Sequence, residues 1–340
     1  MKNVAVLFFV FTLMLSSCGK DGVPDNTNDA PTNLVVTAVV NPDNSGNVTF
    51  TSTATNAVTY AYNFGNGIFQ TNVTGPIIYK YPASGTYTVN STAKSSSGKT
   101  LTTSIQVTVT VGLALVWSDE FNIDGAPNPA VWGYDLGAGG WGNNESQNYT
   151  DRRENSIVQG GALKINLIKE NYSGSPYTSA RLLSKDRYAL KYGRVETRAK
   201  LPAGVGTWPA IWMLGSNISS VSWPACGEID IMEHVGKELN KIHATLHYPG
   251  RFGGNADGGS RVISNATTEF HKYSLEWSAT SIKMFVDDLL IHSVTNTSSL
   301  PFNQNFFFIL NVAMGGNFGG TIDPAVTAAT MEIDYIRVYQ

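Results

Sequence analysis

Short runs of alternating apolar and polar residues cover most of the chain after Ala30. Early examples are "NLVVTAVV", "NVTFTSTA" and "TTSIQVTVTV", and later ones are "ALKINLIK", "IHATLHY" and "MEIDYIRVYQ". Successive side chains of a strand point to opposite faces, so a period of two predicts β-strands with one buried face. Because no segment keeps a helical period, the pattern predicts an all-β protein.

The strand pattern divides the chain into two domains. Residues 31–111 contain short Thr- and Val-rich runs with turn residues at short intervals, which is typical of a small Ig-like β-sandwich. Residues 112–340 carry all seven Trp and many short strands separated by Gly and Asn turns, which predicts a large sandwich or jelly roll. The last strand runs to Gln340, so we expect the C-terminus to be tied into a sheet.

The first 18 residues have the composition of an export signal. One Lys precedes an apolar run from Val4 to Leu15, which is too short to span a membrane. The stretch "LSSC" resembles a bacterial lipobox, and this resemblance implies that Cys18 is lipidated and anchors the protein to the outer membrane of the cell envelope, on its periplasmic or surface face. The alternative is an ordinary cleaved signal. Residues 19–30 are polar and turn-forming, which predicts a flexible tether.

Composition excludes one class of partner and limits the cysteine chemistry. Charged residues make up 14% of the chain and the net charge is −3, so there is no electrostatic footprint for nucleic acid. Only Cys18 and Cys226 are present, so a lipid on Cys18 leaves no partner for a disulfide. We therefore expect Cys226 to be a small buried thiol beside nearby acids.

Three carboxylates gather in "CGEIDIMEHVG", which otherwise looks like one strand. Strict alternation puts Glu228 and Asp230 on one face and Glu233 on the other. One extra, bulged residue between Asp230 and Glu233 would bring all three to the same face. The carboxyls of Glu228 and Glu233 would then lie about 5–6 Å apart, as in retaining glycosidases. Asp230 between them would raise an apparent pKa, which a general acid needs.

Two other interpretations of these acids stay open from the residues alone. Clustered oxygens also suit a calcium ion. The acids could instead decorate a solvated face, although adjacent like charges destabilise such a face and His234 should point away. Each interpretation predicts different neighbours for the three carboxylates.

Aromatic and polar residues near the acids suggest a sugar-binding groove. Trp208, Trp212 and Trp223 precede Glu228 closely, and Trp faces stack against the apolar faces of sugar rings. The alternative is that they fill the core. Polar residues in otherwise apolar or turn-rich stretches could orient sugar hydroxyls or cap loops; they are Asn144, Glu145, Arg181 and His247.

The smaller domain resembles the PKD (polycystic-kidney-disease-type) domain. The resemblance rests on "YNFGNG" and "YKYPASGTYTV". Tyr62 stands where the family usually has Trp, and Asn63 and Asn66 replace its acids. We expect the domain to act as a spacer, with glycan binding as the alternative.

The larger domain resembles the laminarinase-type branch of glycoside hydrolase family 16. The motifs, in order, are "LVWSDEFN", "WGNNESQNYT", "YGRVETRAKLPAGVGTWPAIWMLG", "WPACGEIDIMEHVG", "IHATLHYPG" and "NVAMGGNFGG". The resemblance implies a β-jelly-roll whose concave sheet holds the glycan, with Glu228 as nucleophile, Glu233 as acid/base and Asp230 as supporting acid. It also implies retaining cleavage of internal β-1,3-glucan linkages without a catalytic cofactor. Phe318 and Gly319 stand where the family more often has Trp and Pro.

The same resemblance implies a structural calcium ion, held by Glu120, the carbonyl of Gly161, and Asp334. Glu120 and Asp334 could equally be plain surface acids. We expect a lipid-anchored, monomeric endo-β-1,3-glucanase acting on β-glucan. The alternatives are a family 16 enzyme for another β-glycan, such as mixed-linkage glucan or a galactan, and a non-catalytic glycan-capture lipoprotein.

Overall fold

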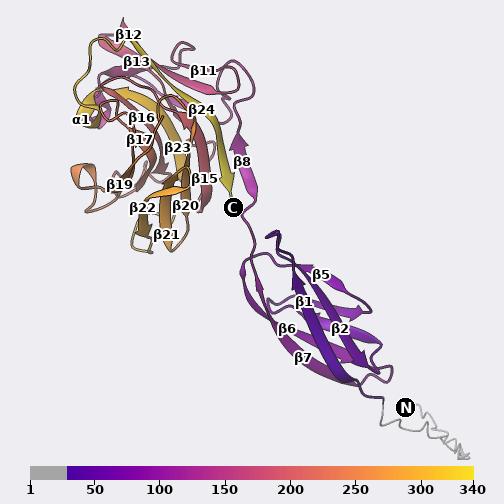
Figure 1. Ribbon diagram of the computed structural model, residues 1–340. Coiled ribbons are helices and arrows are strands. Elements are labelled where there is room, and N and C mark those ends of the chain that lie inside the picture. Colours follow the sequence, from indigo (N-terminus) through magenta and orange to yellow (C-terminus); the bar gives the residue numbers. More distant parts are fainter. Residues whose placement is uncertain (1–28) are drawn as a thin grey trace, which may run out of the picture. The chain divides into compact units, whose positions relative to one another are not determined.

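The computed structural model describes residues 29–340, which form two compact units that divide after Gly112 (Figure 1). The export signal with Cys18 and the tether up to residue 28 lie outside the described residues. The predicted all-β class is confirmed, since helix in the described part of the chain is confined to three short turns: η1 (Gly140–Gly142), η2 (Gly253–Asn255) and α1 (Gly316–Gly319). Within residues 29–340 no helix has the length and apolar character needed to cross a membrane.

The first unit is the predicted small β-sandwich. One sheet has the order β1-β2-β5 and the other β4-β3-β6-β7. The core of this unit is formed by alternate residues of its strands, whose side chains point inward. The buried residues include Val48 and Phe50 of one sheet and Tyr62 and Val89 of the other. Its strands are β1 (Thr32–Val40), β2 (Asn47–Thr55), β3 (Thr59–Asn63), β4 (Phe69–Val73), β5 (Ile77–Lys80), β6 (Gly85–Lys94) and β7 (Thr100–Val109).

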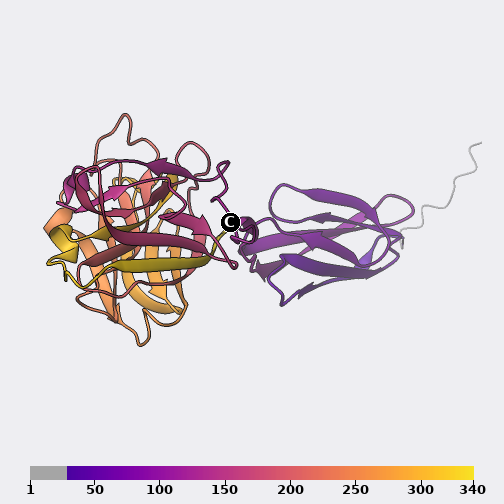
Figure 2. The ribbon, with the colours of Figure 1, turned by 90° about the horizontal axis from the view of Figure 1, so that it is seen from above.

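The second unit is a larger sandwich of two sheets, seen from two sides in Figures 1 and 2. The ten-stranded sheet runs β10-β13-β12-β24-β15-β20-β21-β22, with β11 beside β12 and β8 beside β24. Its strands are β8 (Leu115–Asp119), β10 (Gln147–Tyr149), β11 (Ser156–Val158), β12 (Leu163–Tyr172), β13 (Ser175–Ser179), β15 (Gly193–Lys200), β20 (His271–Trp277), β21 (Ser281–Val286), β22 (Leu289–Thr295) and β24 (Ala328–Tyr339).

The seven-stranded sheet runs β19-β18-β17-β16-β23-β14-β9 and carries the three acids of β17 together with Arg181, Trp208, Trp212 and His247. Next to its central strand β16 lies β23, whose sequence "FFFILNVAM" is buried at every position. Such a continuous apolar run is typical of a strand covered on both faces. The strands are β9 (Gly133–Asp135), β14 (Arg181–Leu183), β16 (Thr207–Gly215), β17 (Glu228–His234), β18 (Lys241–His247), β19 (Asp257–Val262) and β23 (Phe306–Met314).

The C-terminal strand closes the second unit. β24 lies between β12 and β15 and also pairs with β8, the first strand of the unit. Gln340 and Ala114 exchange both of their backbone hydrogen bonds, at 2.8 and 2.9 Å. The prediction that the C-terminus is tied into a sheet is therefore confirmed.

The faces of β17 show where a site can form. Ile229 and Ile231 belong to the core between the two sheets, whereas Glu228 and Asp230 line a cavity on the opposite face. One face of the seven-stranded sheet is therefore the inside of the sandwich, and the other is the floor of a binding groove.

Candidate active site

A β-bulge in β17 brings the third acid to the same face as the other two. Asp230 pairs with Thr245 and Glu233 with His243, so three steps along β17 match two steps along β18. The register shifts between the same two acids and β16 as well. The bulge predicted from the acid spacing is confirmed, and it turns Glu233 into the groove with Glu228 and Asp230.

The groove has a volume of about 850 Å³ and combines acids, aromatic rings and small residues. Four Trp side chains lie in its wall, and three of them are those expected from the sequence. The main lining residues are Trp141, Asn143, Glu145, Arg181, Trp208, Trp212, Trp223, Glu228, Asp230, Glu233, His243, Thr245, His247, Asn311, Asn317 and Phe318. A polar groove with aromatic walls suits a sugar chain.

Indole N–H groups hold the two outer carboxylates. Trp223 donates from Nε1 to Oε2 of Glu228 at 3.0 Å, and Trp208 donates from Nε1 to Oε1 of Glu233 at 3.0 Å. The hydroxyl of Thr245 lies 3.4 Å from the other oxygen of Glu233. Each carboxylate is thus held by the N–H edge of a Trp ring that also lines the groove. The rest of each carboxylate is available to a substrate.

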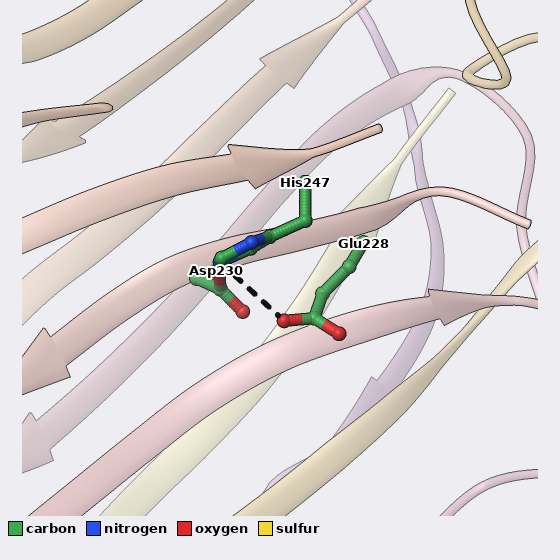
Figure 3. A group of neighbouring side chains, drawn as sticks. All are labelled: Glu228, Asp230 and His247. Carbon is green, nitrogen blue, oxygen red and sulfur yellow. Dashed lines mark ion pairs between the residues drawn. The ribbon is translucent and has the colours of Figure 1, made fainter. Parts of the chain in front are cut away.

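His247 lies against the middle of the acid cluster (Figure 3). Its Nε2 is 3.2 Å from Oδ2 of Asp230 and 3.7 Å from Oε1 of Glu228. On the other side of the ring, the backbone N–H of Gly253 donates to Nδ1 at 3.1 Å. Since Nδ1 accepts, the neutral ring carries its proton on Nε2 and presents a donor to the carboxylates.

This tautomer bears on the metal interpretation of the acids. Within residues 29–340, Glu228, Asp230 and His247 form the one group of His, Cys and acid ligand atoms close enough to hold an ion, all within 4.8 Å. A neutral His that binds a metal through Nε2 carries its proton on Nδ1. That proton would face the N–H of Gly253, so the observed arrangement favours proton chemistry over metal binding.

Burial and mutual repulsion make the cluster retain protons. Burial, followed by the neighbouring charge of Asp230, raises the pKa of Glu228 well above its usual value. Burial and the charge of Glu233 do the same for the pKa of Asp230, and burial raises the pKa of Glu233. Three such groups titrate as one unit and cannot all ionise at neutral pH. A retained proton is what general acid catalysis requires.

Arg181 also lines the groove, where it contacts two Trp rings. Its guanidinium carbon lies 4.9 Å from the ring centres of both Trp141 and Trp212, and its Nε lies 3.0 Å from Asp135. Cation–π contacts with both rings hold the side chain in one orientation. The charge of Arg181 also favours the ionised form of Glu228.

A series of side-chain hydrogen bonds holds Trp212, one of the two rings beside Arg181. Trp212 donates from Nε1 to Oδ1 of Asn311 at 2.8 Å, Asn311 donates to the hydroxyl of Tyr149 at 3.0 Å, and Tyr149 donates to Glu145 at 3.2 Å. Asn311 and Tyr149 are buried, so unpaired polar atoms there would be costly. These hydrogen bonds therefore fix the position of Trp212.

Comparison with known proteins identifies the larger unit. The family model described as "Glycosyl hydrolases family 16" matches residues 143–337. The chain belongs to this family. It is thus a glycoside hydrolase, and the PKD domain model matches residues 33–111, which gives it an N-terminal PKD domain.

The similar proteins each cover about two thirds of this glycoside hydrolase. A β-glucanase of Rhodothermus marinus is 46% identical over 242 residues, 66% of this chain and 85% of that protein. A glucan endo-1,3-β-glucosidase of Cryptopygus antarcticus is 36% identical over 248 residues, 66% of this chain and 90% of that protein. The X-ray structure of the laminarinase from Rhodothermus marinus superposes with a TM-score of 0.65 and 45% identity, covering 67% of this chain and 97% of that one.

Five of the six residues expected to bind sugar line the groove of the hydrolase: Arg181, Trp208, Trp212, Trp223 and His247. Asn144 is not among the lining residues. Its backbone has a φ of 58°, and its side chain donates to Oδ1 of Asn317 at 2.8 Å. The neighbouring Asn143 lines the groove instead. Glu145, which the sequence also singled out, lines it too.

The sequence left several groove residues unassigned. Trp141 and Asn143 lie in the stretch "WGNNE", next to residues that were chosen. His243 and Thr245 share the face of β18 with His247, so the period of two within "IHATLHY" was a usable signal. Asn311 is a lone polar residue in the apolar run of β23. Asn317 belongs to α1, after the end of β23, and gave no signal.

Two predictions about buried groups are confirmed. Cys226 is a fully buried free thiol, and burial raises its pKa to about 11, so it is not a reactive thiolate. His234 is fully buried on the face of β17 away from the groove, with Nε2 2.9 Å from the carbonyl of Leu239.

The residues predicted to hold calcium have other partners. Glu120 accepts two hydrogen bonds from Arg337, at 2.9 and 2.8 Å, and Asp334 accepts one from Arg198 at 2.5 Å. Gly161 lies in the turn before β12 with a φ of 78°. Both carboxylates are paired with guanidinium groups in this structure, and the calcium site stays a prediction.

Proposed function

We propose that this glycoside hydrolase cleaves internal β-1,3-glucosidic bonds of laminarin-type β-glucans with retention of configuration. The names of its relatives, a β-glucanase and a glucan endo-1,3-β-glucosidase, support this substrate. One observation carries the proposed mechanism: the bulge in β17 places Glu228 and Glu233 on the groove floor on either side of Asp230, each held by an indole N–H.

Glu228 is the proposed nucleophile. Its carboxylate attacks the anomeric carbon and forms a glycosyl ester, while Glu233 gives its proton to the departing glycosidic oxygen. Glu233, now a carboxylate, then takes a proton from a water molecule that attacks the anomeric carbon. The ester bond breaks, Glu228 leaves as a carboxylate, and both acids return to their starting state.

Asp230 and His247 set the proton balance of the two Glu residues. Asp230 is 3% exposed, and its charge raises the pKa of Glu228. Nε2 of His247 lies 3.7 Å from Glu228 and 3.2 Å from Asp230, and the ring favours the ionised forms of Glu228 and Glu233. No cofactor takes part in these steps, because the two carboxylates supply both the nucleophile and the acid.

Product analysis on a panel of purified glycans tests the substrate. We expect internal cleavage of soluble β-1,3-glucan, with a rapid fall in chain length, and a β-configured product at first appearance by proton NMR. Faster cleavage of mixed-linkage glucan or a galactan would move the assignment to another family 16 substrate. Binding without cleavage of any member would favour the glycan-capture alternative.

We also propose that the protein is a monomer anchored to the outer membrane through a lipid on Cys18, as the "LSSC" stretch suggests. The expected result is a membrane-associated protein that Cys18→Ala releases into the soluble fraction. The purified Cys18→Ala protein should elute at the mass of one chain. Release without this substitution would instead indicate an ordinary cleaved signal.

Calcium is retained as a proposed structural ion with no part in catalysis. If it binds at Glu120 and Asp334, the two arginine pairs must open. We expect added calcium to raise the melting temperature and EDTA to reverse the rise, while Glu120→Gln abolishes the response. An unchanged melting temperature would exclude the site.

A further inference from the structure

The PKD domain has a hollow on the solvent side of its four-stranded sheet. The hollow has a volume of about 280 Å³ and lies across β4, β3, β6 and β7. Tyr62 and Val89 are buried toward the domain core, so their neighbours along the strands face outward. The outward residues that line the hollow are Asn63, Phe69, Thr71, Asn90, Thr92 and Thr102.

Phe69 is unusual in its exposure. Among the Phe and Trp side chains of residues 29–340, only Phe69, Trp223 and Phe252 are exposed, at 67%, 42% and 45%. Trp223 lines the catalytic groove, and Phe252 packs edge-to-face against it with ring centres 5.4 Å apart. Phe69 is thus even more exposed than Trp223 and Phe252. An exposed ring gives up the free energy of burial. A single exposed apolar side chain is common on protein surfaces, so the residues around Phe69 decide whether it belongs to a site.

The polar residues beside Phe69 have free capacity for hydroxyl groups. Within residues 29–340, the side-chain amide of Asn90 makes no hydrogen bond. Asn63 uses its Oδ1 to accept from the N–H of Gly65 at 3.0 Å, which leaves its amide N–H groups available. The hydroxyls of Thr92 and Thr102 pair with each other at 2.8 Å across the two strands.

The hollow is also uncharged. Each of its lining residues in the described chain is Ala, Tyr, Phe, Asn or Thr. A surface without charge offers nothing to a nucleic acid, an acidic peptide or a sulfated glycan. A ring face flanked by amides and hydroxyls matches a neutral sugar, whose pyranose ring has an apolar face and a rim of hydroxyls.

We propose that this face of the PKD domain is a second, non-catalytic binding site for a neutral β-glucan chain. One glucose ring lies against Phe69, and the amides of Asn63 and Asn90 bond its hydroxyls. The choice of β-glucan as the occupant rests on the proposed function of the hydrolase. Such a site holds the enzyme on its polymer between cleavage events, which raises the local concentration of substrate.

Retention on an insoluble β-1,3-glucan tests the proposal in the full chain. Glu228→Gln is the background, so that the polymer is not degraded. Phe69→Ala is compared with Ile78→Ala, which truncates an equally exposed apolar residue (69%) in the other sheet of the same domain. Because both positions are exposed, we expect neither substitution to unfold the domain, and equal melting temperatures check this.

We expect Phe69→Ala to weaken retention about fivefold, Asn90→Ala to weaken it to a similar degree, and Ile78→Ala to leave it unchanged. Equal retention of Phe69→Ala and Ile78→Ala overturns the second site. A change from dimer to monomer in Phe69→Ala would also overturn it, because the face would then bind a second copy of the chain. Failure of the proposed function is distinguishable, since it appears as a native chain that does not hydrolyse soluble β-1,3-glucan.

Discussion

The Nε2 atom of His247 lies 3.2 Å from Oδ2 of Asp230. The N–H of Gly253 donates to the other ring nitrogen, Nδ1, so the tautomer that fits this contact carries its proton on Nε2, facing the acids. Gly253, at the start of η2, thereby selects the tautomer of a side chain that contacts two members of the acid cluster.

The first prediction concerns this donor. In His247→Ala, Glu228 and Glu233 lose a neighbour that favours their ionised forms, so their pKa values rise further. We expect the acidic limb of the kcat/KM profile to move to higher pH. His247→Gln keeps an N–H donor and should restore part of the shift. An acidic limb that stays in place in His247→Ala would show that the ring only shapes the groove.

Glu228→Gln should abolish hydrolysis while glucan binding persists. The amide keeps the shape of the side chain, and its oxygen can still accept from Trp223, but it cannot form the glycosyl ester. We expect kcat to fall by about 10³-fold or more, with a dissociation constant for a β-1,3-glucan oligosaccharide close to that of the native chain. A variant that keeps a tenth of the native turnover would disprove the assignment of Glu228 as nucleophile.

Glu233→Ala should be rescued by azide. Without Glu233 no residue activates water in the second step, but azide needs no general base and can attack the glycosyl ester. We expect added azide to restore turnover on a substrate with a good leaving group, and NMR should identify a β-glycosyl azide. An α-glycosyl azide would indicate inversion. Glu238→Ala is the matched control, because Glu238 lies outside the groove lining and should not respond to azide.

Asp230→Asn should stabilise the protein at neutral pH. Asp230 has a raised pKa in the folded chain, so the folded state keeps a proton that the unfolded state releases above about pH 4. Stability therefore falls as pH rises from there through the folded pKa, and the substitution removes this loss. We expect the melting temperature to rise by about 2–4 °C at pH 7, with a smaller rise near pH 4.

Asp288→Asn is the control for this prediction. Asp288 is exposed, and hydrogen bonding to Lys272 lowers its pKa, so its ionised form is favoured in the folded state. Its substitution should leave the melting temperature unchanged or slightly lower at pH 7. A loss of stability in Asp230→Asn at pH 7 would contradict the proposed charge conflict.

Trp223 and Trp132 should respond differently to truncation. Trp223 is 42% exposed in the groove, whereas Trp132 is 2% exposed in the core. We expect Trp223→Ala to lower kcat/KM on β-1,3-glucan about tenfold or more with a small change in melting temperature. Trp132→Ala should cost about 3–5 kcal/mol of unfolding free energy. Trp223→Phe separates the two roles of this ring, since it keeps a stacking face and loses the donor to Glu228.

If Trp223→Ala and Trp132→Ala lose stability to the same degree, the aromatic wall belongs to the core and the substrate lies elsewhere. Unchanged activity in Trp223→Ala would lead to the same conclusion about the wall. Both substitutions are made in the same protein, and their stabilities are compared without substrate. The comparison therefore does not depend on the glucan chosen.

The sequence by itself determined the class of fold and the position of the acids. A period of two needs only local information, because each strand must bury one face. The bulge followed from charge spacing, since Glu228, Asp230 and Glu233 can share a face only if one residue is extra. The family motifs added the roles of the acids, which spacing alone left open.

Only the tertiary structure decided which neighbours complete the site. Trp132, Trp208 and Trp223 are one residue type in two settings, because the folded chain buries the first in the core and places the other two at the groove. Asn144 turns away to Asn317, more than a hundred positions later in the chain, through a left-handed backbone that the sequence did not reveal. The proton position on His247 depends on a loop N–H that meets the ring only after folding. Such contacts join residues that are distant in sequence or lie on separate elements. The sequence alone therefore does not predict them, because they form only when the chain folds.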